Sequence, residues 1–341
     1  MKIAIHHRSG SFSDRWIAYC QQKSIDYKIV NCYDSDIVEQ VKDCDALMWH
    51  HHHGDYKDVL TAKRILFALE HAGVKVFPNF HTGWHFDDKV AQKYLLEAID
   101  APLVPSYVFY DKNEALDWAE TTTYPKVFKL KGGAGAANVK LVRSKKDAVK
   151  LINTAFGKGF SQFNRLGNLK ERYRKYRSGK DSLLGVAKGL GRLVIPTEFA
   201  KLQSRERGYV YFQDFIPNEG YDIRIETAGD KALAMIRFTR ENDFRASGSG
   251  NITRVSKYIT DDSIQLAFEL ADKLKHQACA FDFVRDERDN KLYIVEMSYG
   301  YGVDDDEYDY GYWDRKCKHH NVEFNGIDWM IENLIEELRN T

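Results

Sequence analysis

The chain has 341 residues, 43% of them hydrophobic and 13% aromatic, a composition that excludes a disordered chain and allows about two or three packed units. Its 50 basic and 50 acidic residues cancel to a formal net charge of zero, which argues against a simple polybasic nucleic-acid binder or an acidic solvating chain. The charges are unevenly spread, however. Residues 153–208 contain thirteen basic and four acidic side chains, whereas residues 296–314 contain seven acidic side chains and no basic one.

The first 80 residues predict a small parallel α/β unit, because short apolar segments alternate with amphipathic ones. The predicted strands cover residues 2–6, 27–30, 46–49 and 74–77. One helix is predicted near Trp16 and a second one over residues 60–72. Two polar groups follow the first and the third strand, namely His6–Arg8 and His50–His53. Ligands bind at the carboxyl ends of parallel strands, so both groups have either a binding role or a structural one, and the histidine tract has metal binding as a further alternative.

The N-terminal sequence MKIAIHHRSG lacks the apolar stretch of a signal peptide, and no window has the run of about 18 apolar residues that a membrane helix needs. The five cysteines are scattered and odd in number, without a CxxC pair, which is typical of free thiols in a reducing compartment. We therefore expect a cytoplasmic protein without a membrane span.

Residues 88–142 combine helical and extended segments with a glycine-rich hairpin. A helix is predicted at Asp88–Ile99, a strand at Tyr107–Tyr110 and a helix at Leu116–Glu120. The segment YPKVFKLKGGAGAANVKLV (124–142) then predicts a β-hairpin whose Gly/Ala-rich centre lets backbone N–H groups approach an anion. The glycine spacing matches neither a P-loop nor a dinucleotide-binding fingerprint, so an ordinary surface turn is the alternative.

The basic window 153–208 predicts either a solvated insertion or a lid that attracts a polyanionic acceptor. Beyond this window, the pattern predicts paired strands joined by a turn at Gly229–Asp230, a long helix, a second strand pair and a C-terminal helix. The strands are predicted at 209–212, 222–227, 232–239, 280–284 and 293–297, and the helices at 264–276 and 329–338.

Asp282 and Glu296 each interrupt an otherwise apolar predicted strand, in AFDFV and YIVEM. Two carboxylates at close range repel each other unless a cation lies between them. Ligand sets of oxygen atoms suit Mg²⁺ or Mn²⁺, and Mg²⁺ is usually shared with substrate phosphates. The pair therefore predicts a metal site, with two hydrogen-bonded acids at strand ends as the alternative.

The order of the motifs resembles the ATP-grasp superfamily, and RimK-like carboxylate–amine ligases in particular. A Lys on a helix (DKVAQK) precedes a Lys before a Gly-rich hairpin (VFKLKGG), the segment YVYFQDFI, Asp-Ile-Arg, and the late Asp and Glu. The resemblance covers roughly residues 85–300. It implies an α/β (α+β) fold in which a Rossmann-like pre-ATP-grasp domain (1–84) precedes a two-subdomain ATP-grasp fold with antiparallel sheets (85–341). The first subdomain (85–212) would bind the nucleotide and include the basic insertion 153–208, and the second (213–341) would be catalytic.

The resemblance also implies a role for each matching residue. The ATP phosphates would be bound by Lys89, Lys129, Lys131, Gly132, Gly133 and Gly135. The hinge that binds adenine would be formed by Gln213, Asp214, Phe215 and Ile216. Asp222 would bind the ribose, and the catalytic Arg224, Arg237 and Arg245 would bind the reacting groups. The ligands of Mg²⁺ (or Mn²⁺) would be Asp282, Glu296 and Ser298.

This chain departs from the family pattern at the expected metal site. The family usually has Glu-x-Asn, where the chain has Glu296-Met297-Ser298, and a Ser hydroxyl is a shorter and weaker magnesium ligand than an amide oxygen. The Asn expected soon after Phe-Arg is displaced to Asn251. The first departure weakens the expectation of a second metal ion.

The resemblance implies an ATP-dependent ligase that joins a small-molecule amine to a carboxylate through an acyl phosphate. The basic window favours a polyanionic acceptor, such as a uronic-acid glycan or an acidic peptide. Nucleic acid is not expected, because the rest of the chain cancels the basic patch. Two alternatives remain: a kinase of the same fold that phosphorylates a small-molecule hydroxyl, and a non-catalytic nucleotide-binding module.

Overall fold

The computed structural model describes residues 1–132, 138–161, 176, 205–240, 243–254, 257–302 and 310–340. These residues form two compact units. Unit 1 consists of Met1–Leu103 and Ile216–Thr341, and unit 2 consists of Val104–Phe215. The domain boundaries expected after residues 84 and 212 follow the family pattern rather than the packing, and they stay a prediction.

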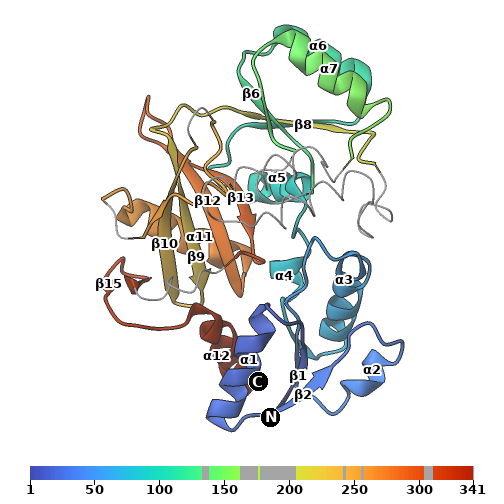
Figure 1. Cartoon of the computed structure of the whole chain (residues 1–341), viewed down its shortest axis with the longest axis vertical. Helices are drawn as coiled ribbons and strands as arrows, with labels where there is room; N and C mark the ends of the chain where they lie inside the picture. The colour runs from blue at the N-terminus through green and yellow to red at the C-terminus, as the bar shows by residue number, and fades with distance from the viewer. Residues whose placement is uncertain are drawn as a thin grey trace. The chain divides into compact units, whose positions relative to one another are not determined.

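Unit 1 begins with a four-stranded parallel sheet in the order β2-β1-β3-β4 (Figure 1). Ile3 and Ile5 pack with helix α1 on one face of β1, and Ala4 belongs to the core that includes helix α3 on the other, so both faces are buried. The predicted parallel α/β unit is confirmed. Its elements are β1 (Lys2–His6), α1 (Phe12–Lys23), β2 (Asp26–Val30), α2 (Ile37–Gln40), β3 (Ala46–Met48), α3 (Tyr56–His71), β4 (Lys75–Phe77) and α4 (Phe80–Gly83).

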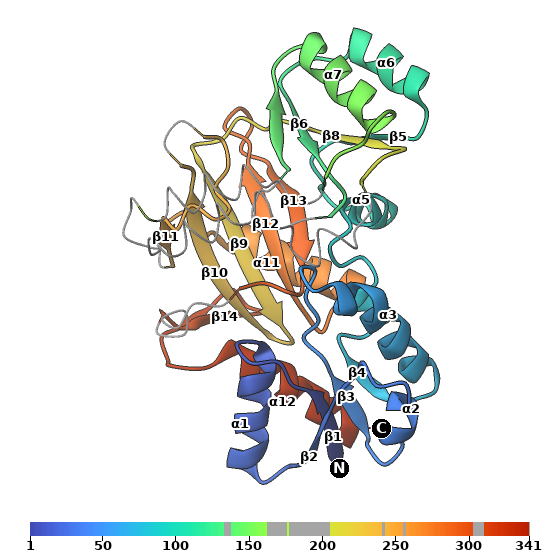
Figure 2. The same cartoon turned by 45° about the vertical axis from the view of Figure 1, so that its right-hand side comes forward.

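The second sheet of unit 1 has seven strands, with β13-β12-β9-β10-β14-β15 along its path and β11 paired to β10 (Figure 2). Its pairings are antiparallel, and helix α11 covers one face through an apolar core that includes Ile223, Phe281 and Phe268. The elements are β9 (Tyr221–Ala228), β10 (Lys231–Phe238), β11 (Ile252–Thr253), α11 (Asp261–Leu274), β12 (Ala278–Arg285), β13 (Leu292–Ser298), β14 (Tyr312–Asp314) and β15 (His319–His320).

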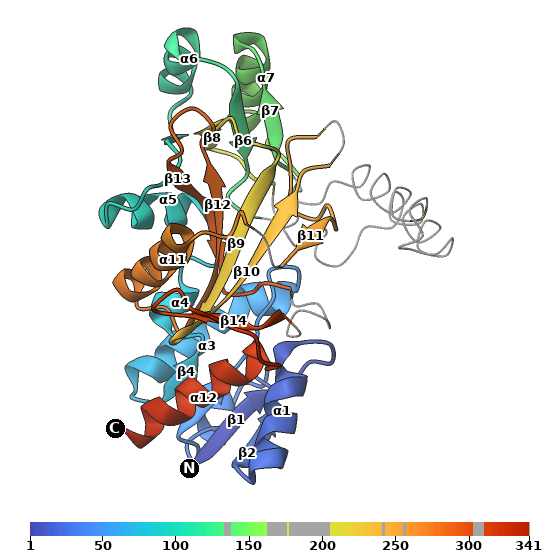
Figure 3. The same ribbon diagram turned by 90° about the vertical axis from the view of Figure 1, so that its left-hand side faces the viewer.

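The last helix, α12 (Gly326–Arg339), packs beside α1 and joins the two ends of the chain in one core (Figure 3). Its buried side chains Trp329, Met330 and Leu334 belong to the same apolar cluster as Trp16 and Phe12 of α1. Arg15 on α1 also forms an ion pair with the first turn of α12. The N-terminal sheet is therefore closed by a helix that is more than 300 residues later in the chain.

Unit 2 is an antiparallel sheet in the order β5-β8-β6-β7, with helices α6 and α7 on one face. Phe128 and Phe212 face these helices, and Trp118 of α6 stacks on Phe212. The predicted hairpin at 124–142 is present as β6 and β7. The elements are β5 (Ser106–Phe109), α6 (Lys112–Thr121), β6 (Lys126–Lys129), β7 (Lys140–Val142), α7 (Lys145–Ala155) and β8 (Val210–Asp214).

All five cysteines are free, and four of them are buried. Within the part of the chain that the structure describes, no helix has the length and hydropathy to cross a bilayer. Gly133, Gly135, most of the basic window and most of the acidic stretch at 300–314 lie outside the described residues.

Candidate active site

One face of the seven-stranded sheet carries charged side chains in the middle of its strands. Along β9, Ile223 and Ile225 point into the core under α11. Because successive side chains of a strand point to opposite faces, Asp222 and Arg224 lie on the other face of the sheet. Most of the sequence-predicted site residues of unit 1 lie on this face.

The strand register brings five predicted site residues side by side. Arg224 on β9 lies opposite Asp282 on β12, and Asp282 lies opposite Glu296 on β13. Arg237 on β10 lies opposite Asp222 on β9. Residues separated by up to 74 positions in the sequence thus form one polar cluster through cross-strand pairing alone.

Asp282 is held by two guanidinium groups. Arg224 Nε and Nη2 donate to its two carboxylate oxygens at 2.7 and 3.0 Å, and Arg237 Nη2 lies 2.9 Å from Oδ2. Arg237 also donates to both oxygens of Asp222, each at 2.7 Å. Burial on its own would raise the pKa of Asp282, but the two guanidinium groups outweigh it and hold that pKa well below its usual range.

Lys89 reaches the same cluster from the first turn of helix α5 (Lys89–Ala98). Its Nζ atom lies 2.9 Å from Glu296 Oε1, and the residue is only 5% exposed. Burial alone would lower the pKa of Lys89, but Glu296, together with Asp87 and Asp88, outweighs it, and the net pKa is raised. The side chain is therefore a fixed ammonium cation beside the paired carboxylates.

Gln92 fixes helix α5 against β13, one turn after Lys89. Its side-chain Nε2 donates to the carbonyl of Met297 at 2.8 Å, and its Oε1 accepts from the Met297 N–H at 3.3 Å. Residues three apart on a helix share a face, so this amide bridge also sets the direction of Lys89 toward Glu296. Sequence reasoning missed Gln92, whose only signal is its spacing from Lys89.

Replacing Gln92 by leucine is expected to lower the free energy of unfolding by about 1–3 kcal/mol, because the peptide group of Met297 loses its partners while buried. Urea unfolding of the variant measures this change. Gln265→Leu on the exposed side of α11 is the matched control, since the single partner of that amide among the described residues is the solvent-exposed Glu269. Equal stability of the two variants would contradict a role for the bridge in docking α5.

The oxygen atoms on this face are of the type that binds magnesium. Asp282 and Glu296 come from paired strands, and Ser298 follows Glu296 by two residues on the same face of β13. Mg²⁺ commonly takes one or two carboxylates and completes its shell with phosphate oxygens and water. Because no group of three or more His, Cys, Asp or Glu side chains gathers among the described residues, a metal here would need the nucleotide to complete its shell.

In unit 2, Lys129 belongs to a buried polar network on the sheet face opposite α6 and α7. Lys129 Nζ donates to Gln213 Oε1 at 2.7 Å, and Gln213 Nε2 donates to Ser106 Oγ at 3.1 Å. The hydroxyl of Tyr211 also donates to Ser106 Oγ, at 3.0 Å. The predicted phosphate-binding lysine and the first residue of the predicted hinge are therefore neighbours.

The carboxylate of Asp214 points to the other face of unit 2. Lys126 Nζ lies 2.5 Å from Asp214 Oδ1 and 5.2 Å from the ring centroid of Tyr107. This buried lysine engages the side chain of Asp214, and the adenine role that the resemblance implies for Asp214 stays a prediction. Sequence reasoning missed Lys126, for which the motif order gives no signal.

The remaining predicted residues lie apart from these networks. The backbone N–H of Lys131 donates to Tyr209, and the Lys131 ammonium lies 4.0 Å from Glu206. Arg245 lies in the loop after β10, where its guanidinium binds Asp243 at 2.6–3.0 Å. Gly132 follows Lys131, Phe215 ends unit 2 and Ile216 begins the second part of unit 1.

Sequence and structure comparisons identify the kind of protein to which this chain is similar. Residues 88–177 match the family described as the ATP-binding domain of the carbamoyl-phosphate synthase L chain. The comparison with curated proteins finds no match.

Solved structures with the same fold include three ATP-grasp or carboxylase proteins. A RimK domain protein ATP-grasp from Sphaerobacter thermophilus is 16% identical, with a TM-score of 0.52, and the match covers 89% of this chain and 92% of that one. The biotin carboxylase domain of 2-oxoglutarate carboxylase from Hydrogenobacter thermophilus, in complex with MgADP, is 16% identical, with a TM-score of 0.58 and coverages of 98% and 69%. The ATP-grasp ligase PsnB is 13% identical, with a TM-score of 0.55 and coverages of 97% and 98%.

Proposed function

We propose that the chain, which shares its fold with ATP-grasp proteins, is an ATP-dependent carboxylate–amine ligase of that superfamily. The observation that carries the proposal is the polar cluster on the seven-stranded sheet. There, Asp282 and Glu296 lie opposite each other on paired strands, and three cations, Lys89, Arg224 and Arg237, contact them. Such a cluster supplies both the carboxylates for a metal ion and the positive charge for phosphoryl groups.

The proposal assigns the same residues that the family resemblance implies. Adenine is assigned to Gln213–Ile216 and the ribose to Asp222. The phosphates are assigned to Lys89, Lys129, Lys131, Gly132, Gly133 and Gly135. Mg²⁺, or alternatively Mn²⁺, is assigned to Asp282, Glu296 and Ser298, and the reacting groups to Arg224, Arg237 and Arg245. Because Arg237 already binds both oxygens of Asp222, the ribose would have to share Asp222 with this guanidinium.

In the proposed reaction, the γ-phosphoryl group of ATP moves to a carboxylate oxygen and gives an acyl phosphate and ADP. The amine nitrogen then attacks the carbonyl carbon; the C–N bond forms, the C–O bond to phosphate breaks, and the amine loses a proton. Bound Mg²⁺ would neutralise charge on the phosphoryl oxygens. The chain itself contributes position and charge: Lys89, held by Glu296, and the two guanidinium groups lie fixed before the substrates bind.

The distribution of charge along the chain supports a more specific proposal for the class of acceptor substrate. The excess of nine positive charges in residues 153–208 supports a polyanionic acceptor, such as a uronic-acid glycan or an acidic peptide. The free cysteines suit a reducing compartment, which supports the cytoplasm as the place of the reaction.

A screen of amine and carboxylate pairs for acceptor-dependent ADP release, with mass analysis of the products, tests the function. The carboxylates should include uronic-acid oligosaccharides and acidic peptides, and the expected product has the summed mass of the two substrates minus one water. A stable phosphorylated acceptor without an amide would identify a kinase and overturn the ligase. A chain that does not bind MgATP at all would overturn both.

A further inference from the structure

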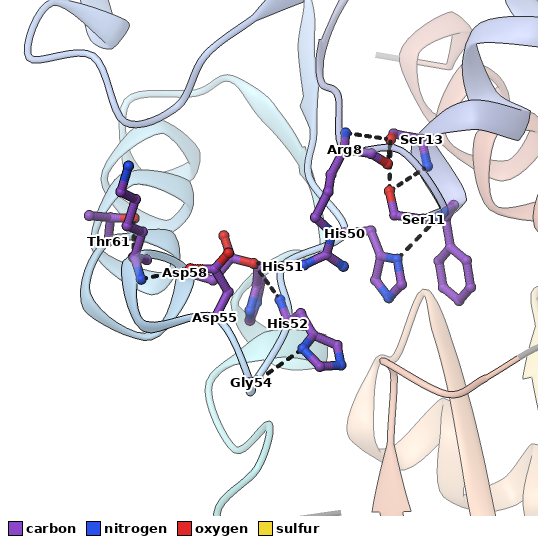
Figure 4. A network of polar contacts seen from close by, with 12 residues as sticks. Arg8, Ser11, Ser13, His50, His51, His52, Gly54, Asp55, Asp58 and Thr61 are labelled. Carbon is purple, nitrogen blue, oxygen red and sulfur yellow. Dashed lines mark hydrogen bonds and ion pairs between the residues drawn. The ribbon is translucent and has the colours of Figure 1, made fainter. Parts of the chain in front are cut away.

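Two polar loops follow the carboxyl ends of β1 and β3 (Figure 4), and they contact the segment that follows β13. Tyr299, directly after Ser298, donates its hydroxyl to the carbonyl of His51 at 2.8 Å. The ring of His50 stacks on Phe12 with centroids 3.7 Å apart, and Phe12 lies 5.7 Å from Tyr301. The loops are therefore anchored within three residues of the predicted metal ligand Ser298.

Backbone amides fix the tautomers of two histidines in these loops. The N–H of Phe12, at the start of α1, donates to His50 Nδ1 at 3.2 Å, and the N–H of Gly54 donates to His52 Nδ1 at 3.0 Å. A ring nitrogen that accepts a hydrogen bond carries no proton, so both neutral rings carry their proton on Nε2. Burial lowers the pKa of His50 to about 3 and that of His52 to about 4, so both rings are neutral donors at physiological pH.

These two Nε2–H groups have no hydrogen-bond partner in the described parts of the chain. Gly300 passes close to the Phe86 ring, which a Cβ atom would approach to 2.8 Å, and the same Cβ position lies 3.9 Å from His50 Nε2, so the segment after β13 runs beside this donor. Donors of this kind, half-buried and set in place by the backbone, are suited to an acceptor group that arrives with a ligand.

Arg8 adds a cation to the same loops (Figure 4). The Ser13 hydroxyl accepts from the Arg8 backbone N–H at 3.0 Å, so the loop that carries the side chain is fixed. Within the described residues, the guanidinium makes a single hydrogen bond, a long one of 3.4 Å to Asp58. Asp58 already accepts from the Tyr33 hydroxyl and from the His52 N–H, each at 2.7 Å.

The other charged groups near these loops have partners of their own. The carboxylate of Asp14 is engaged by His7 Nε2 and by the Gly10 N–H, both at 2.7 Å. Asp55 caps helix α3 through the Lys57 N–H at 2.9 Å. Among the described residues, Arg8 therefore has one long hydrogen bond, and the Nε2–H groups of His50 and His52 have none.

We infer that Arg8, His50 and His52 form a subsite that binds a carboxylate group of the substrate, an inference that rests on the proposed ligase function. A guanidinium matches the planar fork of a carboxylate, and the imidazole N–H groups supply further donors. The loop that carries His50 and His52 contacts Tyr299, directly after Glu296 and Ser298 on β13, so a bound carboxylate would orient the substrate beside the reacting groups.

Kinetics with the carboxylate substrate found by the screen test the subsite. Arg8→Ala is expected to raise KM for that substrate by about tenfold to a hundredfold, with KM for ATP unchanged. His50→Asn and His52→Asn keep an acceptor near the position of Nδ1 but remove the Nε2 donor, and each is expected to raise the same KM by about two- to tenfold. Arg64→Ala, on the exposed side of α3, is the control for loss of one positive charge.

A binding experiment separates this inference from the proposed function. The full chain, labelled with ¹⁵N at Arg and His, is titrated with acetate or with inorganic phosphate and followed by NMR. Acetate is expected to shift the Arg8 Nε signal and the His50 and His52 Nε2 signals in the wild type, and to leave the two His signals unshifted in Arg8→Ala. MgADP binding, measured separately, tests the nucleotide site.

Three outcomes would overturn the subsite. In the first, acetate shifts none of these signals, and in the second, phosphate shifts them but acetate does not. In the third, Arg8→Ala lowers the melting temperature without changing KM for the carboxylate. That third result would mark Arg8 as a structural partner of Asp58. A wild type that fails to bind MgADP but responds to acetate would refute the ligase proposal and keep the anion site.

Discussion

Replacing Asp282 by asparagine is expected to lower the free energy of unfolding by about 3–5 kcal/mol, because it leaves two guanidinium groups without their shared anion. Arg224 and Arg237 have side chains that are only 18% and 6% exposed, so water cannot replace the carboxylate. Arg237 keeps Asp222 as a partner, whereas Arg224 keeps only Glu226, at 4.0 Å, among its ion pairs on the described part of the chain. Urea unfolding measures the change.

Two further variants decide whether this loss comes from buried charge. Asp262→Asn also removes a carboxylate from an arginine, Arg285, but the Asp262 side chain is 58% exposed, so the expected cost is about 0–1 kcal/mol. Combining Asp282→Asn with Arg224→Gln removes the unpaired cation and is expected to regain part of the stability. If Asp282→Asn were as stable as Asp262→Asn, the polar cluster would not support the sheet.

Replacing Glu296 by glutamine is expected to reduce acceptor-dependent ADP release by about a hundredfold to a thousandfold, the usual cost of removing one charged group that stabilises the transition state. Glutamine keeps an oxygen that can accept from Lys89 Nζ, so the fold should be retained and the loss should lie in turnover. A higher Mg²⁺ concentration for half-maximal rate should accompany the loss. The measurement is the rate of ADP release as a function of Mg²⁺ concentration.

Glu287→Gln is the matched control for this variant, because Glu287 lies in the turn of the same β12–β13 hairpin and is exposed. Its rate should equal that of the wild type. A Glu296→Gln variant that released ADP at the wild-type rate with the true substrates would remove Glu296 from the metal site, and with it the main support for the ligase proposal.

The sequence predicted the elements well where a strand or helix has a continuous apolar pattern. The expected strands at 2–6, 222–227 and 280–284 are present as β1, β9 and β12, with ends that differ by up to two residues. The short strands β14 and β15 and helix α7 were missed. β14 and β15 are two or three residues long and only half-buried, so they depend on the pairing of β14 with β10 and of β15 with β14 rather than on their own pattern.

The polar cluster could be predicted as a set of residues but not as a network. Motif order singled out Asp282, Glu296, Arg224 and Arg237, and nothing in it shows that Asp282 binds both arginines. That pairing depends on the register between β9, β10 and β12, which is set by the apolar residues on the opposite face under α11. Lys126 could not be found in this way, because its partner Asp214 lies 88 residues later in the chain.

Helix α12 has a consequence for how the protein is made. A ribosome adds about 5–20 residues per second, so roughly tens of seconds separate the synthesis of α1 from that of α12. During that time Phe12 and Trp16, which α12 covers in the finished protein, lack their partners Trp329 and Met330. Helix α1 is therefore made long before its packing can be completed, and its apolar face has to avoid aggregation until α12 has been made.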